Sequence, residues 1–192
     1  MGNLSILRGA LASAQVSSYT TGSITLPSAK GVFTLPPNSY NSISTVTTTG
    51  TVSSIQFTSI PATYKHLQLR FSAVGTTDHT IQINSALDPD SAHRINGNSS
   101  SAIANSTQIN YLDYYLGFSA TSPSIAILDF LDYANTNKTR VMRYIEGTDR
   151  NGTGEINLGN ILWNTTAAIT AIKISGNISA NSSFALYGIK GA

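Results

Sequence analysis

Apolar and polar residues alternate along most of the chain after Val52. The clearest case is the segment 64–74, where Leu67, Leu69 and Phe71 fall on one side and polar residues lie between them. A period of two is typical of a β-strand with one buried face. The same period, in places with a change of phase, marks further segments: 54–60, 79–87, 107–118, 124–133, 139–146, 155–163, 168–175 and 182–189.

Short stretches rich in Gly, Asn, Asp, Ser and Pro separate these segments. Each of these residue types favours turns for its own steric or hydrogen-bonding reason. About eight or nine short strands, with no long helical period after residue 50, predict an all-β domain. Because most strands have one polar face, we predict an antiparallel, jelly-roll-like β-sandwich rather than a parallel sheet.

Two of the segments change phase part-way along. In 107–118 the apolar positions move from odd numbers, such as Ile109, to even numbers, such as Leu112. In 155–163 the change falls at Gly159 and Asn160. A strand that gains one residue at a β-bulge shifts its pattern in this way. We therefore predict a bulge in each segment.

The segment 184–189 is apolar on both sides. Phe184, Leu186 and Gly188 face one way, while Ala185, Tyr187 and Ile189 face the other. A strand with two apolar faces is typically covered on both. We expect the sandwich core on one side of it and a subunit or neighbouring segment on the other.

The first 45 residues have a different character. Leu4, Leu7 and Leu11 are spaced by three and four residues, which predicts a short amphipathic helix that needs a partner surface. The following residues are poor in charge and contain three prolines. We divide the chain into an extended N-terminal arm, residues 1–45, and a β-sandwich domain, residues 46–192. The three leucines are the predicted attachment contacts.

The composition is polar but weakly charged. Charged residues are 10% of the 192 residues and the net charge is +2, whereas about a quarter is usual. Such a surface suits permanent packing in a larger assembly or contact with glycans. Nucleic acid requires a concentrated basic footprint, which the sequence lacks, and no apolar run approaches the length of a membrane span. We expect neither partner.

Candidate chemistry is sparse. The chain has no cysteine and three histidines, which we expect at the surface rather than in a metal site. Residues 149–155, "DRNGTGE", resemble half a calcium loop but fit an Asn-Gly hairpin turn better. Asp129 and Asp132 would lie on opposite faces of one strand. The sequence predicts no catalytic residue, cofactor or metal.

Aromatic residues concentrate in the middle of the domain. Tyr111, Tyr114 and Tyr115 belong to this group. A core and subunit-interface role is the favoured interpretation, since tyrosine is frequent in both. The alternative is an exposed patch that stacks on sugars, and the three tyrosines are its candidate contacts.

Several blocks of the second half resemble a recurrent β-rich domain of tailed-phage virion proteins, often called tail-fibre or virion structural proteins. The blocks occur in the same order over about residues 40–192. They read "SSIQFTSIPATYKHLQLRFSAVG" from Ser53, "DYANTNKTRVMRY" from Asp132, "WNTTAAITAIKISG" from Trp163 and "SSFALYGIKGA" from Ser182. The resemblance implies a non-enzymatic component of the phage particle surface, and it brings no catalytic residues. The N-terminal arm lies outside the pattern.

From this resemblance we expect a virion protein that is assembled in the host cytoplasm. Its partners would be the major capsid protein or the tail or neck proteins, together with further copies of itself, for instance in a trimer. We favour a capsid decoration or cement protein, because the chain is short and lacks the repeats of a fibre shaft. The alternative is a tail-fibre or receptor-binding adhesin, which would bind host surface glycan.

Overall fold

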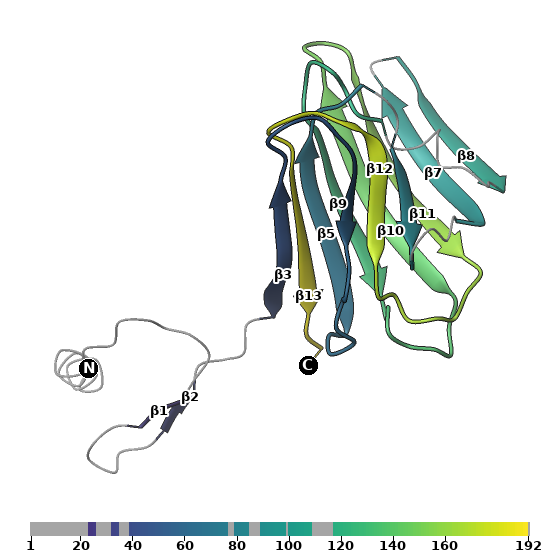
Figure 1. The fold of residues 1–192 in the computed structure, drawn as a ribbon. Helices are drawn as coiled ribbons and strands as arrows, with labels where there is room; N and C mark the ends of the chain where they lie inside the picture. The colour runs from purple at the N-terminus through teal and green to yellow at the C-terminus, as the bar shows by residue number, and fades with distance from the viewer. Residues whose placement is uncertain are drawn as a thin grey trace, which may run out of the picture. The chain divides into compact units, whose positions relative to one another are not determined.

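A computed structural model gives the fold of the protein (Figure 1). It describes residues 23–25, 32–34, 39–76, 79–84, 89–98, 100–108 and 117–191. Contacts divide the chain into two compact units, residues 1–39 and residues 40–192. In the first unit, β1 (Ser23–Thr25) pairs antiparallel with β2 (Val32–Thr34).

The second unit contains all the other strands. In chain order these are β3 (Tyr40–Thr47), β4 (Val52–Phe57), β5 (His66–Ala73), β6 (Thr80–Ile83), β7 (Ser91–Asn98), β8 (Ala102–Gln108), β9 (Ser124–Leu131), β10 (Arg140–Asp149), β11 (Gly154–Trp163), β12 (Ile172–Ile178) and β13 (Ser183–Ile189). They form an eight-stranded sheet in the order β3-β13-β5-β9-β10-β11-β7-β8 and a three-stranded sheet in the order β4-β12-β6.

All the pairings are antiparallel, and the two sheets pack as a sandwich (Figure 1). This confirms the predicted fold class. The core lies between the sheets: Leu67, Leu128 and Trp163 from the large sheet are fully buried, as are Ile81 and Ile174 from the small one. We call the core side of the large sheet its inner face and the opposite side its outer face.

The division between the units falls after Ser39, six residues before the end of the predicted arm. Residues 40–47 belong to the sandwich because β3 pairs along its length with β13. The sequence does not predict this strand, because β3 reads Tyr-Asn-Ser-Ile-Ser-Thr-Val-Thr and polar residues outnumber apolar ones in it.

The strand β13 lies between β3 and β5, so its backbone is paired on both edges. Phe184, Leu186 and Gly188 are buried on the inner face, as their alternation predicts. Ala185, Tyr187 and Ile189 are half-buried on the outer face. The Gly188 position is tight, since a Cβ atom there would overlap the ring of Tyr64.

The predicted bulge in 155–163 is wrong. β11 pairs with β10 over ten consecutive residues and with β7 over eight, and neither register shifts. Ile161 and Trp163 are buried on the inner face, while Ile156 and Leu158 are exposed on the outer face. The change of phase therefore marks apolar residues on both faces of one regular strand. The other predicted bulge, in 107–118, lies almost entirely outside the described residues.

Residues 149–155 form the β10–β11 hairpin, as predicted. Asn151 and Gly152 both have positive φ, 57° and 97°, which is the conformation of a two-residue hairpin turn. The Asn151 amide donates to the Asp149 carboxylate at 2.9 Å, and the Arg150 amide donates to the Thr153 carbonyl. The Asp149 carboxylate thus stabilises the turn.

Candidate interaction surface

The outer face of the large sheet carries exposed aliphatic side chains over its central strands. β10 alternates buried and exposed residues along its length, and β9 does so along most of its own. Several of the exposed positions are apolar: Ile125 is 60% exposed and Ile145 44%. Single exposed apolar residues are ordinary, but a continuous exposed apolar patch marks an interaction site. The register of the sheet shows whether these residues are continuous.

The register aligns the exposed residues in rows that run across the strands. The first, the aliphatic row, crosses β9, β10, β11, β7 and β8 through directly paired residues: Ile127, Ile145, Leu158, Ile95 and Ala104. Side chains at directly paired positions have Cβ atoms about 5 Å apart and touch their neighbours. Five adjacent strands therefore present one unbroken aliphatic strip to the outside.

A second row, two residues along each strand, alternates large residues with glycine. This alternating row consists of Ile125, Gly147, Ile156, Gly97 and Ala102. Ile125 and Ile156 are both more than half exposed. Gly147 and Gly97 carry no side chain, so each leaves a gap beside an isoleucine. The Gly147 gap belongs to a hollow whose walls include Ile125, Ile145 and Ile156.

The third row is polar and lies on the other side of the aliphatic row. It runs through Gln68, Asp129, Arg143, Asn160 and His93. Gln68 Nε2 donates to Asp129 Oδ1 at 2.7 Å, and the Arg143 guanidinium lies 3.5 Å from Asp129 Oδ2. This polar row carries one negative and one positive side chain close to each other near its middle.

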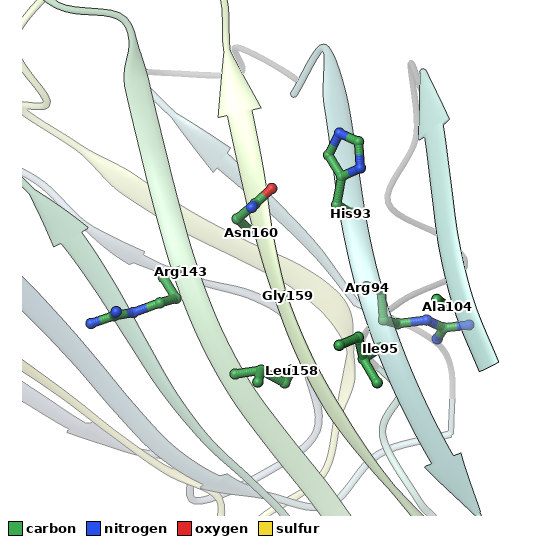
Figure 2. A pocket seen from close by; sticks show the side chains of 8 residues that line it. All are labelled: His93, Arg94, Ile95, Ala104, Arg143, Leu158, Gly159 and Asn160. Carbon is green, nitrogen blue, oxygen red and sulfur yellow. The ribbon is translucent and has the colours of Figure 1, made fainter. Parts of the chain in front are cut away.

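Figure 2 shows where the polar and aliphatic rows meet. Arg143 comes from β10, Asn160 and Leu158 from β11, and His93 and Ile95 from β7. They line a shallow hollow in the outer face together with Arg94, Ala104 and Gly159. The hollow combines an aliphatic floor with hydrogen-bonding groups at one side, which suits contact with another surface.

The outer face changes character towards β3. Arg70 on β5 lies over the rings of Tyr40 and Tyr187, 5.5 Å and 5.4 Å from their centroids. Its Nε atom donates to Gln68 Oε1 at 2.6 Å. The polar side chains of β5 thus contact one another and the tyrosine rings of β13 and β3. The exposed aliphatic area is thus limited to the strands from β9 to β8.

The inner face of β10 holds two buried charged side chains that the sequence did not single out, Arg140 and Glu146. Arg140 is 2% exposed and donates to the backbone carbonyls of Asp132, Asn135, Lys138 and Thr166. It fixes the β9–β10 connection. Nearby, hydrogen bonds from Lys138 and Lys65 hold the pKa of the Asp132 carboxyl well below its usual range.

His79 is fully buried, so the expectation of a surface position is wrong for this residue. Its ring stacks on Phe118 with the centroids 4.2 Å apart and meets the edge of Phe71 at 5.3 Å. Glu146 Oε1 lies 3.8 Å from His79 Nε2. Burial lowers the pKa of His79 from 6.5 to about 3, so the ring is neutral at ordinary pH. By contrast, His93 is exposed and His66 half-buried.

Both sets of predicted contact residues lie outside the described residues. These are the attachment leucines Leu4, Leu7 and Leu11, and the tyrosines Tyr111, Tyr114 and Tyr115. The aromatic neighbours that are described, Phe118, Phe130, Tyr133 and Tyr144, are buried in the core. The described residues contain no group of three or more His, Cys, Asp or Glu that could hold a metal ion. No helix in the described part of the chain is long and apolar enough to cross a membrane.

Sequence reasoning missed the outer face, although the signal was present. The segments 124–133 and 139–146 carry apolar residues on both sides of the strand, as the segment 184–189 also does. Two apolar faces are predicted above only for 184–189. Comparisons with family models, with curated proteins and with solved structures found no match for this chain.

Proposed function

We propose that the protein is a non-enzymatic structural component of a tailed-phage particle, and that it decorates or cements the capsid. The observation that carries the proposal is the exposed aliphatic strip over five strands of the large sheet. A surface of this kind suits a protein that is permanently packed in an assembly. The weak charge of the chain supports the same view.

The assignment to a phage particle rests on the resemblance of the blocks from residue 53 onward to phage virion proteins. Most of these blocks lie on sandwich strands: Ser53–Gly75 spans most of β4 and all of β5, and the final block spans β13. The first unit, residues 1–39, is the proposed attachment segment. In this proposal the sandwich is displayed outward and the first unit binds neighbouring virion proteins.

Counting copies in the particle tests the proposal. Quantitative mass spectrometry of purified virions should find the chain in hundreds of copies, as a capsid lattice requires. A few copies to a few dozen would place it in the tail, and would favour the tail-fibre or adhesin alternative. Absence of the chain from purified virions would contradict a structural role altogether.

A truncation tests the attachment segment, and the structure fixes where to cut. Removal of residues 1–39 keeps β3 and its pairing with β13, whereas a cut after residue 45 would destroy most of that strand. We expect the truncated chain to fold, as circular dichroism and cooperative unfolding would show, but to be missing from virions. Incorporation at full occupancy would rule out this role of the segment.

A further inference from the structure

We propose that the outer face of the large sheet binds a second copy of this chain, through a two-fold axis that runs along the strands between β10 and β11. The proposal concerns the isolated protein and does not depend on a phage particle. It rests on the order of side chains within the three rows. A two-fold interface brings one patch against itself, so the patch must be complementary to its own reversed copy.

The geometry of such an axis is simple. Rotation by half a turn about a line parallel to the strands keeps each row at its own level and reverses the order of the strands. With the line between β10 and β11, β10 lies opposite β11 of the second copy, and β9 lies opposite β7. Each row therefore faces the same row of the second copy, with the strands in the opposite order.

The alternating row is complementary to its own reversal. Gly147 lies opposite Ile156 of the second copy, so an exposed isoleucine enters the gap that the glycine leaves. Ile125 in the same way lies opposite Gly97. At all four positions an isoleucine faces a glycine, and close-packed interfaces avoid both voids and overlap in this way.

The aliphatic row matches apolar groups with apolar groups. Ile145 lies opposite Leu158 of the second copy, and Ile127 opposite Ile95. Side chains that are 37–59% exposed in one chain would become buried in the pair. This removal of aliphatic surface from water supplies the driving force for association.

The polar row brings no like charges together. Arg143 lies opposite the Asn160 amide, and Asp129 lies opposite His93. Other axes fit worse: an axis along β10 would set Arg143 against itself, and one between β9 and β10 would set Arg70 against Leu158. The position of the axis thus follows from both charge and size.

The dimensions suit a stable dimer. Strands lie about 4.8 Å apart and successive rows about 7 Å apart, so the three rows over five strands span on the order of 20 Å in each direction. A stable interface buries about 800 Å² on each partner. The three rows cover about half of this area in projection, and the exposed side chains of Leu131 and Val141, beyond the polar row, extend the same face. Aligned sheets cross at about 30°, so the match is closest on β10 and β11, beside the axis.

Sedimentation equilibrium of the full chain tests the proposal directly. We expect twice the chain mass of 20.3 kDa. Ile156→Asp should weaken association at least about thirtyfold, as loss of a central interface residue does. Thr45→Asp is the matched control, because Thr45 is exposed on the outer face of β3, outside the rows. A single-chain mass, a three-chain mass, or a dimer unaffected by Ile156→Asp would overturn the proposal.

Engineered cysteines test the register without a disruptive charge, since the chain has no cysteine of its own. An Ile145→Cys protein mixed with a Leu158→Cys protein should form the mixed disulfide faster than either variant links to itself. Thr45→Cys mixed with Leu158→Cys is the control and should not cross-link. If the Ile145–Leu158 pair forms no faster than this control, the proposed axis is wrong.

Discussion

The two faces of β10 carry apolar residues in nearly equal measure, yet their surroundings differ completely. Met142 and Tyr144 on the inner face are buried under the small sheet, whereas Val141 and Ile145 on the outer face are 44% exposed. The chain thus covers one apolar face of this strand and leaves the other open. We infer that the inner face sets the stability of the fold and the outer face sets its association.

The largest difference in unfolding free energy should appear between substitutions of two arginines of β10. Arg140→Met removes an inner-face guanidinium that donates to four backbone carbonyls, and should cost about 3–5 kcal/mol of unfolding free energy. Arg143→Met on the outer face should cost less than about 1 kcal/mol. Urea unfolding of both variants measures this, and equal losses would show that burial does not separate the two faces.

Neighbouring residues of β9 give a second matched pair. Leu128→Ala on the inner face should cost about 2–5 kcal/mol, because Leu128 is fully buried. Ile127→Ala on the outer face should cost much less in dilute solution. Its cost should grow with protein concentration, since association stabilises the folded state by mass action. Unfolding at two concentrations distinguishes the variants, and a concentration-independent Ile127→Ala effect would count against association through this face.

The buried His79 makes the stability of the core depend on pH. His79 is neutral in the core with a pKa of about 3, whereas in the unfolded chain its pKa is near 6.5. Below pH 6.5 the unfolded state therefore binds a proton that the folded state does not. Stability should fall by about 1.4 kcal/mol for each pH unit between 6.5 and 3.

The groups around His79 are Glu146 and the rings of Phe71 and Phe118. His79→Phe should lessen the loss of stability on acidification between pH 6.5 and 4, whereas Leu128→Ala, a core substitution without a titratable group, should not. Thermal unfolding across this pH range compares the two variants. Equal acid sensitivity of His79→Phe and the natural chain would show that the buried imidazole is not its source.

Substitutions of glycine should have the smallest effects on stability and self-association. Gly188→Ala on the inner face would push a Cβ atom into the Tyr64 ring and should cost about 1–3 kcal/mol. A Cβ atom on Gly97, on the outer face, would meet only Ile156 Cγ2 at 3.6 Å, an ordinary contact. Gly97→Ala should leave stability almost unchanged but weaken self-association, because it begins to fill the gap. Unfolding and sedimentation measurements on both variants check the two effects.

The sequence allowed the sandwich to be predicted because most strands combine a buried apolar face with polar turns between them. It failed for β7 and β8, where polar residues outnumber apolar ones and Asn96 is buried against Asn157 through a 2.8 Å hydrogen bond. It also failed at β11, where the change of phase predicts a bulge but Ile156 and Leu158 lie on the outer face of a regular strand. A period of two in the sequence shows that a strand has two faces. Only the folded structure shows which residues lie side by side across five strands.

Concentration-dependent footprinting tests the central claim, that the outer face between β9 and β8 is a contact surface. Hydroxyl radicals modify exposed side chains, so reactivity of Ile145, Ile156 and Leu158 should fall as the protein is concentrated from a monomeric solution. Tyr40, which is 45% exposed outside the rows, should react at a constant rate. If the three aliphatic residues and Tyr40 keep the same relative reactivity at every concentration, the face is not where copies of this chain meet.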